Sequence, residues 1–460
     1  MNKPMIKKLI VLMIIALLNG TFLIIALNQQ PKIIDNSIII TTPEKVFIMV
    51  SALLIIYGMI RLLRSLLAQK SLVSSPNNSS LLQASNDMIE PIENEEEIVE
   101  EKSRFFMLRQ VDAKVQEENH YTFEDDINLQ RICDEFREFA AYSLGLYYDI
   151  KDIRRFIGGL AVSHIMILQG MSGTGKTSLA YAFGDYLKNP TTVVPIQPMW
   201  KERTDLIGYY NEFTKKFNET TLLKKLYEAN HNDQMYITVL DEMNIARVEY
   251  YFAEFLSLLE LPDHNKRHLD VIADVWDTDP ALLKDGKLIL PSNMWFIGTA
   301  NNDDSTFSIS DKVYDRAMVI NLDKKAQPFI PKVMQGRSVS MSQFTVLVEK
   351  AKKQYALSSR NLRRLKEFDK YLIKQFQITF GNRIMQQIKD YVPVIIACGG
   401  SELSALDDIM SKKVLRKLET KNMVYVKNSA PSLITFIETL FGENEMSQCI
   451  EYIQTIEINA

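Results

Sequence analysis

Two long apolar runs stand near the start of the chain. Residues 9–27 (LIVLMIIALLNGTFLIIAL) contain no charged side chain, and residues 46–63 (VFIMVSALLIIYGMIRLL) contain only Arg61. A helix needs roughly 20 apolar residues to cross the hydrocarbon core of a bilayer. The pattern therefore predicts a transmembrane hairpin over residues 1–70. A signal peptide is the alternative for the first run, and a buried core hairpin for both, but no small-residue cleavage site follows the first run.

Basic residues flank these runs on their outer sides. Lysine and arginine precede the first run and end the second, and fewer lie in the loop between: Lys3, Lys7, Lys8, Arg61, Arg64 and Lys70 on the flanks, Lys32 and Lys45 in the loop. Such residues accumulate on the cytoplasmic side of membrane proteins. We therefore expect both termini and the bulk of the chain in the cytoplasm, with the hairpin in the inner or plasma membrane.

The next segment, residues 71–104, is polar and becomes acidic. It begins rich in serine and asparagine and includes the sequence ENEEEIVEE. Like charges repel one another along such a segment, and it has few apolar residues to bury. This composition predicts a flexible acidic linker.

From residue 105 onward the pattern is that of a globular protein. Apolar residues at helical spacing over residues 123–158 predict helices, and the short apolar strand HIMILQG then ends at Gly170. The sequence KTSLAYAFGDYL has helical spacing again. Further apolar strands are expected within residues 235–244 and 293–304, so strands and helices alternate along this part of the chain.

The loop between the first strand and its helix has the composition of a phosphate-binding loop. Its pattern is Gly170-x4-Gly175-Lys176-Thr177. Glycines permit the tight geometry in which backbone N–H groups point at a phosphate, the lysine reaches the β- and γ-phosphates, and the threonine hydroxyl ligates Mg²⁺. The motif predicts nucleotide binding by Gly170, Ser172, Gly173, Thr174, Gly175, Lys176, Thr177 and Ser178.

Polar residues also end the second and third strands. Asp241 is placed to hold Mg²⁺, and Glu242 to polarise an attacking water. Two acids that open a surface helix are the alternative, but the preceding nucleotide loop favours catalysis. The third strand ends in GTANN, where Asn301 or its neighbour Asn302 is placed to orient that water.

Composition adds little to this picture. The formal net charge is -4, so no basic excess indicates nucleic-acid binding. Cys133, Cys398 and Cys449 are scattered without a C-x-x-C pair. Their spacing favours buried free thiols over a metal site or a disulfide.

Taken together, the motifs resemble those of the AAA+ ATPases, and more narrowly the branch of McrB-type and MoxR-type ATPases. The resemblance covers roughly residues 125–440 and rests on Gly170–Thr177, the acids in DEMN (241–244), GTAN ending at Asn301, and Asp315-Arg316. It implies an α/β domain over residues 105–335, with a doubly wound parallel sheet, and an α-helical lid within 336–460. ATP and Mg²⁺ are the implied cofactors, although McrB-type proteins use GTP.

The resemblance also implies two arginine roles and an assembly. Arg316 matches the arginine finger that reaches into a neighbour's site. Arg360 looks like the sensor-2 arginine of the lid, with Arg363 and Arg364 as alternatives. Related proteins form rings, usually hexamers.

Two insertions and a helical pair complete the resemblance. Residues 193–220 correspond to an insertion that faces the pore or the top of related rings, with a plain buried hairpin as the alternative for its aromatic residues. Residues 261–290 correspond to a hairpin before the third strand. Residues 380–419 indicate a helix, a Gly-Gly turn and a second helix, as in the lid of McrB-type proteins.

These features favour a membrane-anchored AAA+ ATPase that hydrolyses ATP in a ring to remodel a partner protein. The alternative is the motor subunit of a restriction or anti-phage complex with a separately encoded nuclease, and a P-loop kinase or signalling switch is a third hypothesis. McrB-type motors carry a nucleic-acid-binding module where this chain has its predicted hairpin and linker. Nucleic acid is therefore expected to act indirectly if at all, and the motifs leave the substrate open.

Overall fold

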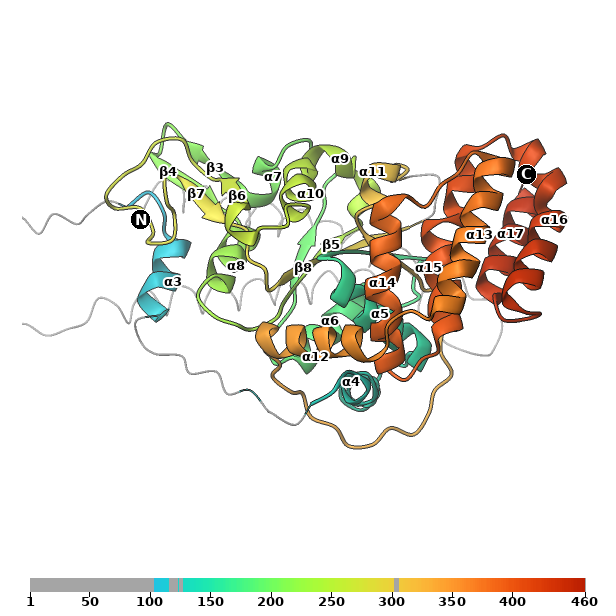
Figure 1. Cartoon of the computed structure of the whole chain (residues 1–460). Coiled ribbons are helices and arrows are strands. Elements are labelled where there is room, and N and C mark those ends of the chain that lie inside the picture. The colour runs from blue at the N-terminus through green and yellow to red at the C-terminus, as the bar shows by residue number, and fades with distance from the viewer. Residues whose placement is uncertain (1–102, 116–122, 124–126, 302–305, 460) are drawn as a thin grey trace, which may run out of the picture. The chain divides into compact units, whose positions relative to one another are not determined.

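The computed structural model describes residues 103–115, 123, 127–301 and 306–459 (Figure 1). All of them belong to Glu97–Ala460, one of the two compact units into which the chain divides. The predicted membrane hairpin and most of the predicted linker lie outside the described residues. Within the described part, no helix is both long enough and apolar enough to cross a membrane.

A five-stranded sheet forms the centre of this unit, and all its strand pairs are parallel. In spatial order its strands are β2 (Thr192–Pro195), β5 (Tyr236–Asp241), β8 (Met294–Ala300), β1 (Ile165–Gln169) and β9 (Met318–Asn321). The strands β1, β5 and β8 are almost wholly buried. Burial on both faces explains why their sequences are continuously apolar rather than alternating.

Side chains of β8 alternate between the two faces of the sheet and join two different cores. Phe296 packs against Phe252 and Phe255 on one face, and Trp295 belongs to the other. The first face is covered by α8 (Thr221–Ala229), α9 (Val248–Tyr251) and α10 (Ala253–Leu259), the second by α4 (Leu129–Leu144), α5 (Ile150–Val162) and α6 (Lys176–Tyr186). Helices on both faces confirm the α/β class and the parallel sheet.

Two β-hairpins and the helix α3 (Met107–Val115) gather at one end of the first core (Figure 1). The hairpins are β3 (Gly208–Asn211) with β4 (Lys216–Glu219), which follow α7 (Thr204–Ile207), and β6 (His268–Asp270) with β7 (Lys287–Ile289). The carboxylate of Glu219 accepts hydrogen bonds from the backbone N–H groups of Phe106, Met107 and Leu108. Strand β4 therefore fixes the N-terminus of α3.

The chain is helical from Met341 onward. The helices are α12 (Met341–Gln354), α13 (Ser359–Phe376), α14 (Gly381–Ala397), α15 (Glu402–Lys413), α16 (Met423–Phe441) and α17 (Ser447–Asn459), with the 3-10 turn η3 (Leu415–Thr420) after α15. Helix α12 packs against the sheet, where the rings of Phe344 and Trp295 lie 5.9 Å apart. Helices α13 to α17 enclose a core of their own, and we call them the helical domain.

Helix α14 joins the helical domain to the α/β part through α5. The two helices approach closely at Gly158, where a Cβ atom would lie 2.6 Å from Cδ1 of Ile395. The expected helix, Gly-Gly turn and helix are α14, Gly399-Gly400 and α15. All three cysteines are free and buried.

Candidate nucleotide-binding site

The glycines of the predicted phosphate loop adopt conformations that other residues avoid. Gly170, Gly173 and Gly175 have φ values of 143°, 77° and 91°, in the region that favours glycine. A Cβ atom at Gly170 would collide with the carbonyl oxygen of Leu322, just after β9. The loop therefore needs glycine to curl back from the end of β1 to the start of α6.

The start of α6 is open to an anion. Gly175 is its N-cap residue, and no side chain caps the first N–H groups of the helix, so these groups and the helix dipole suit a phosphate. Nζ of Lys176 lies 2.9 Å from the carbonyl oxygen of Gly170 and 2.8 Å from that of Met171. The ammonium group is thus already folded into the loop.

The other predicted contacts of the loop lie around this ammonium. Ser172 is exposed and Ser178 is half-buried. The hydroxyl of Thr174 donates a hydrogen bond of 3.0 Å to the carbonyl oxygen of Met171. The Thr174 hydrogen bond therefore closes the turn of the loop on itself.

Thr177 and Asp241 come together across the sheet, as their predicted metal-binding role requires. The Thr177 hydroxyl donates to Oδ1 of Asp241 at 2.7 Å. The hydroxyl of Thr299, on β8, donates to the same oxygen at 2.8 Å and accepts a hydrogen bond of 2.9 Å from the backbone N–H of Glu242. Thr299 was not singled out from the sequence, because only the pairing of β8 with β5 brings it to the acids.

Glu242 has an unusual backbone conformation for its type. Its φ and ψ are 52° and 47°, the left-handed region, and it precedes the 3-10 turn η1 (Met243–Ile245). Non-glycine residues held there cost free energy and cluster at functional sites. The hydrogen bond from its N–H to Thr299 helps to hold this conformation, and its side chain is exposed at the end of β5.

Asn301 follows β8 at the same edge of the sheet. Its carbonyl oxygen accepts hydrogen bonds from Nδ2 of Asn244 at 3.0 Å and from the hydroxyl of Thr306 at 3.2 Å. Its alternative, Asn302, lies outside the described residues. The backbone at Asn301 is therefore anchored to the segment that follows Glu242.

Arg316 lies before the amino ends of the strands, two residues ahead of β9, whereas the other site residues follow the carboxyl ends of β1, β5 and β8. The hydroxyl of Ser163, two residues before β1, donates to the carbonyl oxygen of Arg316 at 2.8 Å. Strand β1 then runs five residues, about 17 Å, to the phosphate loop. The guanidinium group pairs instead with Glu260 at 2.8 Å. The structure does not bring Arg316 to the phosphate loop of its own chain.

The three candidate sensor-2 arginines lie near the start of α13. Arg360 and Arg363 are exposed, and Arg364 donates to Oδ1 of Asn361 in the same helix at 3.0 Å. None of them lines the cleft described below, and within the described part of the chain none makes a hydrogen bond or ion pair with the phosphate loop, Asp241 or Glu242. Their role stays a prediction.

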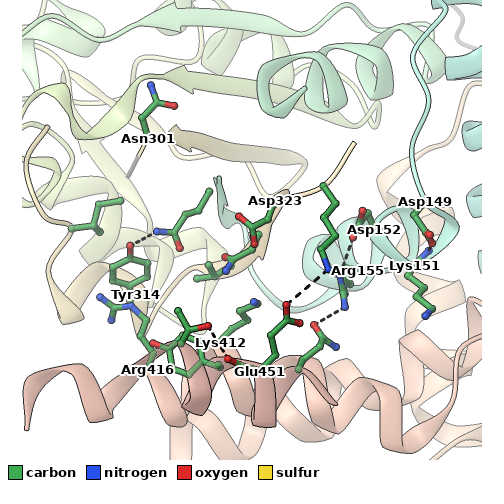
Figure 2. A pocket seen from close by; sticks show the side chains of 18 of the residues that line it. Asp149, Lys151, Asp152, Arg155, Asn301, Tyr314, Asp323, Lys412, Arg416 and Glu451 are labelled. Atoms are coloured by element: carbon green, nitrogen blue, oxygen red, sulfur yellow. Dashed lines mark hydrogen bonds and ion pairs between the residues drawn. The ribbon is translucent and has the colours of Figure 1, made fainter. Parts of the chain in front are cut away.

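A cleft of about 1310 Å³ separates the carboxyl ends of strands β1, β8 and β9 from the helical domain (Figure 2). Asn301 and Asp323 line it from the sheet side, and Asp149 from the start of α5. Lys412 and Arg416 line it from the helical domain, and burial lowers the pKa of Lys412. No local motif marks these two cations, so sequence reasoning missed them.

Tyr148 connects the cleft wall to the phosphate loop. Its hydroxyl donates to the carbonyl oxygen of Gly175 at 3.2 Å, and Asp149, next in the chain, lines the cleft. Burial raises the pKa of Tyr148 well above its usual range, so the side chain stays a neutral donor. This hydrogen bond links the residue beside the cleft wall to the phosphate loop, although none of residues 170–178 lines the cleft itself.

Comparisons with known proteins divide the chain into two matched regions. Residues 165–317 match a family model described as an AAA domain (dynein-related subfamily). Residues 336–459 match one described as a domain of unknown function (DUF8727). Among curated proteins, none matches the sequence.

Among solved structures, the chain is similar to a full-length MCM homologue from Methanopyrus kandleri, with 10% sequence identity and a TM-score of 0.36. The similarity covers 64% of this chain and 64% of that chain. The chain thus spans less than two thirds of the length of this protein.

Proposed function

We propose that this chain is a membrane-anchored ATPase that works in a ring to remodel a partner protein, and the match of residues 165–317 to an AAA domain model supports the ATPase part of this proposal. The single observation that carries the hydrolytic part is the 2.7 Å hydrogen bond between Thr177 and Asp241. It joins the phosphate loop to the acidic strand end, although 64 residues separate them in the sequence.

The residues present fit ATP and Mg²⁺. The uncapped start of α6 and the buried ammonium of Lys176 suit the phosphates. The oxygens of Thr177 and Asp241 are hard ligands of the kind that Mg²⁺ prefers, and they already lie within hydrogen-bond distance. When bound, the metal ion offsets negative charge on the phosphates.

The carboxylate of Glu242 would accept the proton of the attacking water. Its strand places it directly after Asp241, and Thr299 holds its backbone. Asn301, at the end of the neighbouring strand, would orient the water from the other side. These roles follow from the positions of the residues at one edge of the sheet.

A ring is proposed because Arg316, the arginine whose position matches an arginine finger, lies away from the phosphate loop of its own chain. This residue lies near the amino ends of the strands. It would act on the site of a neighbouring subunit, where a cation offsets charge that develops in the transition state. We take a hexamer as the working assembly. Arg360 is kept as the proposed sensor-2 residue.

The membrane and partner parts of the proposal rest on the sequence. The apolar runs at 9–27 and 46–63 would hold the ring at the inner or plasma membrane, with the ATPase domain in the cytoplasm. A complete hydrolytic set beside such an anchor, with no second catalytic motif in the sequence, favours mechanical work on another protein.

The variant Glu242→Gln tests the hydrolytic assignment. It should lower the turnover of ATP at least about 100-fold, because an amide cannot accept the proton. It should still bind ATP, because the phosphate loop is intact. The matched control is Glu212→Gln, an exposed position in the turn of the β3–β4 hairpin. Turnover that survives in Glu242→Gln means that another group is the base.

The same full-length variant, stalled with ATP bound, should retain its partner when it is purified from native membranes. A membrane protein that is absent when Lys176→Ala is used instead supports the remodelling function. Capture of a nuclease or a DNA-binding chain favours the defence motor. Recovery of the variant from the soluble fraction would contradict the membrane anchor.

A further inference from the structure

A buried lysine connects the helical domain to the segment that carries Arg316. Lys413, the last residue of α15, is 4% exposed. Its Nζ donates to the carbonyl oxygens of Tyr314 at 2.7 Å and Asp315 at 3.3 Å, and to that of Ala317. An ammonium group has three N–H donors. Two of the three carbonyl acceptors precede Arg316 in the chain and one follows it, so the lysine holds the backbone on both sides of Arg316.

The cost of burying this lysine indicates a polar role. Burial lowers the pKa of Lys413 to about 7, and the three carbonyl oxygens oppose this because they bind the charged form. A methionine of similar length would fill the space without the cost of dehydrating an ammonium group. What the lysine adds is a hold on the backbone at residues 314–317.

Two more residues of the helical domain hold the same segment, residues 311–317, which we call the finger segment. It includes α11 (Asp311–Tyr314). Gln387 of α14 donates to the carbonyl oxygen of Asp315 at 3.2 Å. Arg416 of η3 pairs with Asp311 at 2.8 Å, and its guanidinium carbon lies 3.3 Å from the centre of the Tyr314 ring.

The side chain of Arg316 is itself bound to the helical domain through Glu260. One carboxylate oxygen of Glu260 pairs with Arg316 at 2.8 Å, and the other pairs with Arg383 of α14. Nε of Arg316 is buried and has no hydrogen-bond partner in the described part of the chain. To reach a neighbouring subunit, Arg316 must leave Glu260, and the helical domain holds the other side of that carboxylate.

The finger segment also lines the cleft of its own chain and contacts the residue that precedes the phosphate loop. The hydroxyl of Tyr314 accepts a hydrogen bond of 2.6 Å from Gln169, which directly precedes Gly170 of the phosphate loop. Tyr314, Lys412 and Arg416 line the cleft near one another (Figure 2). A shift of the helical domain at the cleft therefore also moves groups that hold the finger segment.

We propose that Lys413 is a positioning residue through which the helical domain of one subunit sets the reach of its Arg316 into the site of a second copy of this chain. The inference rests on the proposed role of Arg316 as an arginine finger.

Mixed assemblies of full-length subunits test this inference. Donor subunits carry Lys176→Ala, so they supply Arg316 but do not hydrolyse ATP. Acceptor subunits carry Arg316→Ala and keep an intact phosphate loop. Turnover in the mixture then comes from acceptor sites that a donor serves, and Lys413→Met is placed in either the donor or the acceptor.

In the donor, Lys413→Met should lower the turnover number at least about tenfold and leave the KM for ATP within about twofold, since ATP binds in the other subunit. In the acceptor it should change turnover by less than about twofold. The matched control is Lys417→Met in the donor, on η3, whose side chain makes no hydrogen bond or ion pair with the finger segment within the described part of the chain, and it should be neutral.

Each other result overturns the inference in a distinguishable way. Equal losses from donor and acceptor positions mean a general structural role for Lys413, and full turnover with Lys413→Met in the donor means no role. No turnover in the unmodified mixture overturns the proposed role of Arg316 itself, and with it this inference.

A second variant decides the matter if Lys413→Met subunits do not assemble. The side chain of Arg383 is 52% exposed, so Arg383→Gln should not disturb the core. Without it, Glu260 pairs with Arg316 alone and holds it more firmly. We expect turnover to fall about threefold or more when this variant is in the donor, and not in the acceptor. An equal effect in both positions, or none in the donor, overturns the inference.

Discussion

At the scale of single residues, one hydroxyl decides how the acidic strand end is held. Thr299 is 2% exposed, and its hydroxyl both donates to Asp241 and accepts from the N–H of Glu242. It therefore connects the proposed metal ligand to the proposed base. A neighbouring strand carries a natural comparison, because the hydroxyl of Thr238 on β5 is buried without a hydrogen-bond partner among the described residues.

We predict that Thr299→Val lowers the turnover number about tenfold and costs about 1–2 kcal/mol of stability, since the N–H of Glu242 loses its acceptor. The KM for ATP should change little, because the phosphate loop is untouched. Thr238→Val is the control and should be neutral or slightly stabilising. If the two valine variants behave alike in steady-state kinetics, the hydroxyl of Thr299 has no catalytic importance.

At the scale of elements, the last residue of the predicted linker and the residue after it attach α3 to the two hairpins. The guanidinium of Arg104 makes two hydrogen bonds to the carboxylate of Asp279, at 2.8 and 2.6 Å, and lies 4.5 Å from the ring of Trp276. Phe105 stacks on Phe217 of β4 at 4.9 Å. Arg104, assigned to the linker from its sequence position, therefore contacts the loop between β6 and β7.

Replacing this arginine should release α3 from the hairpins. Arg104→Ala would leave the buried carboxylate of Asp279 without its cation, at a local cost of about 3–5 kcal/mol. We expect residues 103–115 to lose protection in hydrogen–deuterium exchange, while the sheet keeps its protection. The control Gln110→Ala, at an exposed position on α3 whose side chain makes no hydrogen bond within the described part of the chain, should change exchange little. Unchanged protection of α3 in Arg104→Ala would show that Glu219 and Phe217 suffice to hold it.

At the scale of the whole molecule, the phosphate loop and Arg316 lie at opposite ends of the strands of one sheet, and a half-buried histidine directly precedes strand β1. Nε2 of His164 donates to the carbonyl oxygen of Ser292 at 2.8 Å, and its ring stacks on Trp295 at 5.3 Å. Burial lowers the pKa of His164 to about 4. The folded chain therefore keeps this imidazole neutral well below the pH at which an unfolded chain would protonate it.

This histidine should make the fold sensitive to acid. Between pH values of about 6.5 and 4 the unfolded chain binds a proton that the folded chain does not, so the free energy of unfolding falls as pH falls, by up to about 3 kcal/mol. His164→Phe removes this contribution and should flatten the pH dependence in that window. Urea unfolding at pH 7 and at pH 5 measures the free energy of unfolding of both proteins. An equal change in this free energy between the two pH values in both proteins would contradict the assignment.

The sequence by itself determined the local parts of this protein. The phosphate loop requires only a strand, a glycine-rich loop and a helix that follow one another in the chain. In the structure, Gly170, Gly173 and Gly175 have the positive φ values that glycine readily adopts. Continuous apolar runs marked the buried strands, so the parallel sheet followed. Asp241 and Glu242 could be found because they directly follow one of these strands.

Only the tertiary structure decided how distant segments meet. Thr299 meets Asp241 and Glu242 because β8 pairs with β5. Lys412 and Arg416 line the cleft because α15 and η3 face the sheet. Lys413 contacts the finger segment across 96 to 99 positions of sequence. None of these residues stands in a local motif. Their roles arise from contacts between elements far apart in the chain, and the spacing of residues along the sequence does not encode which faces will touch.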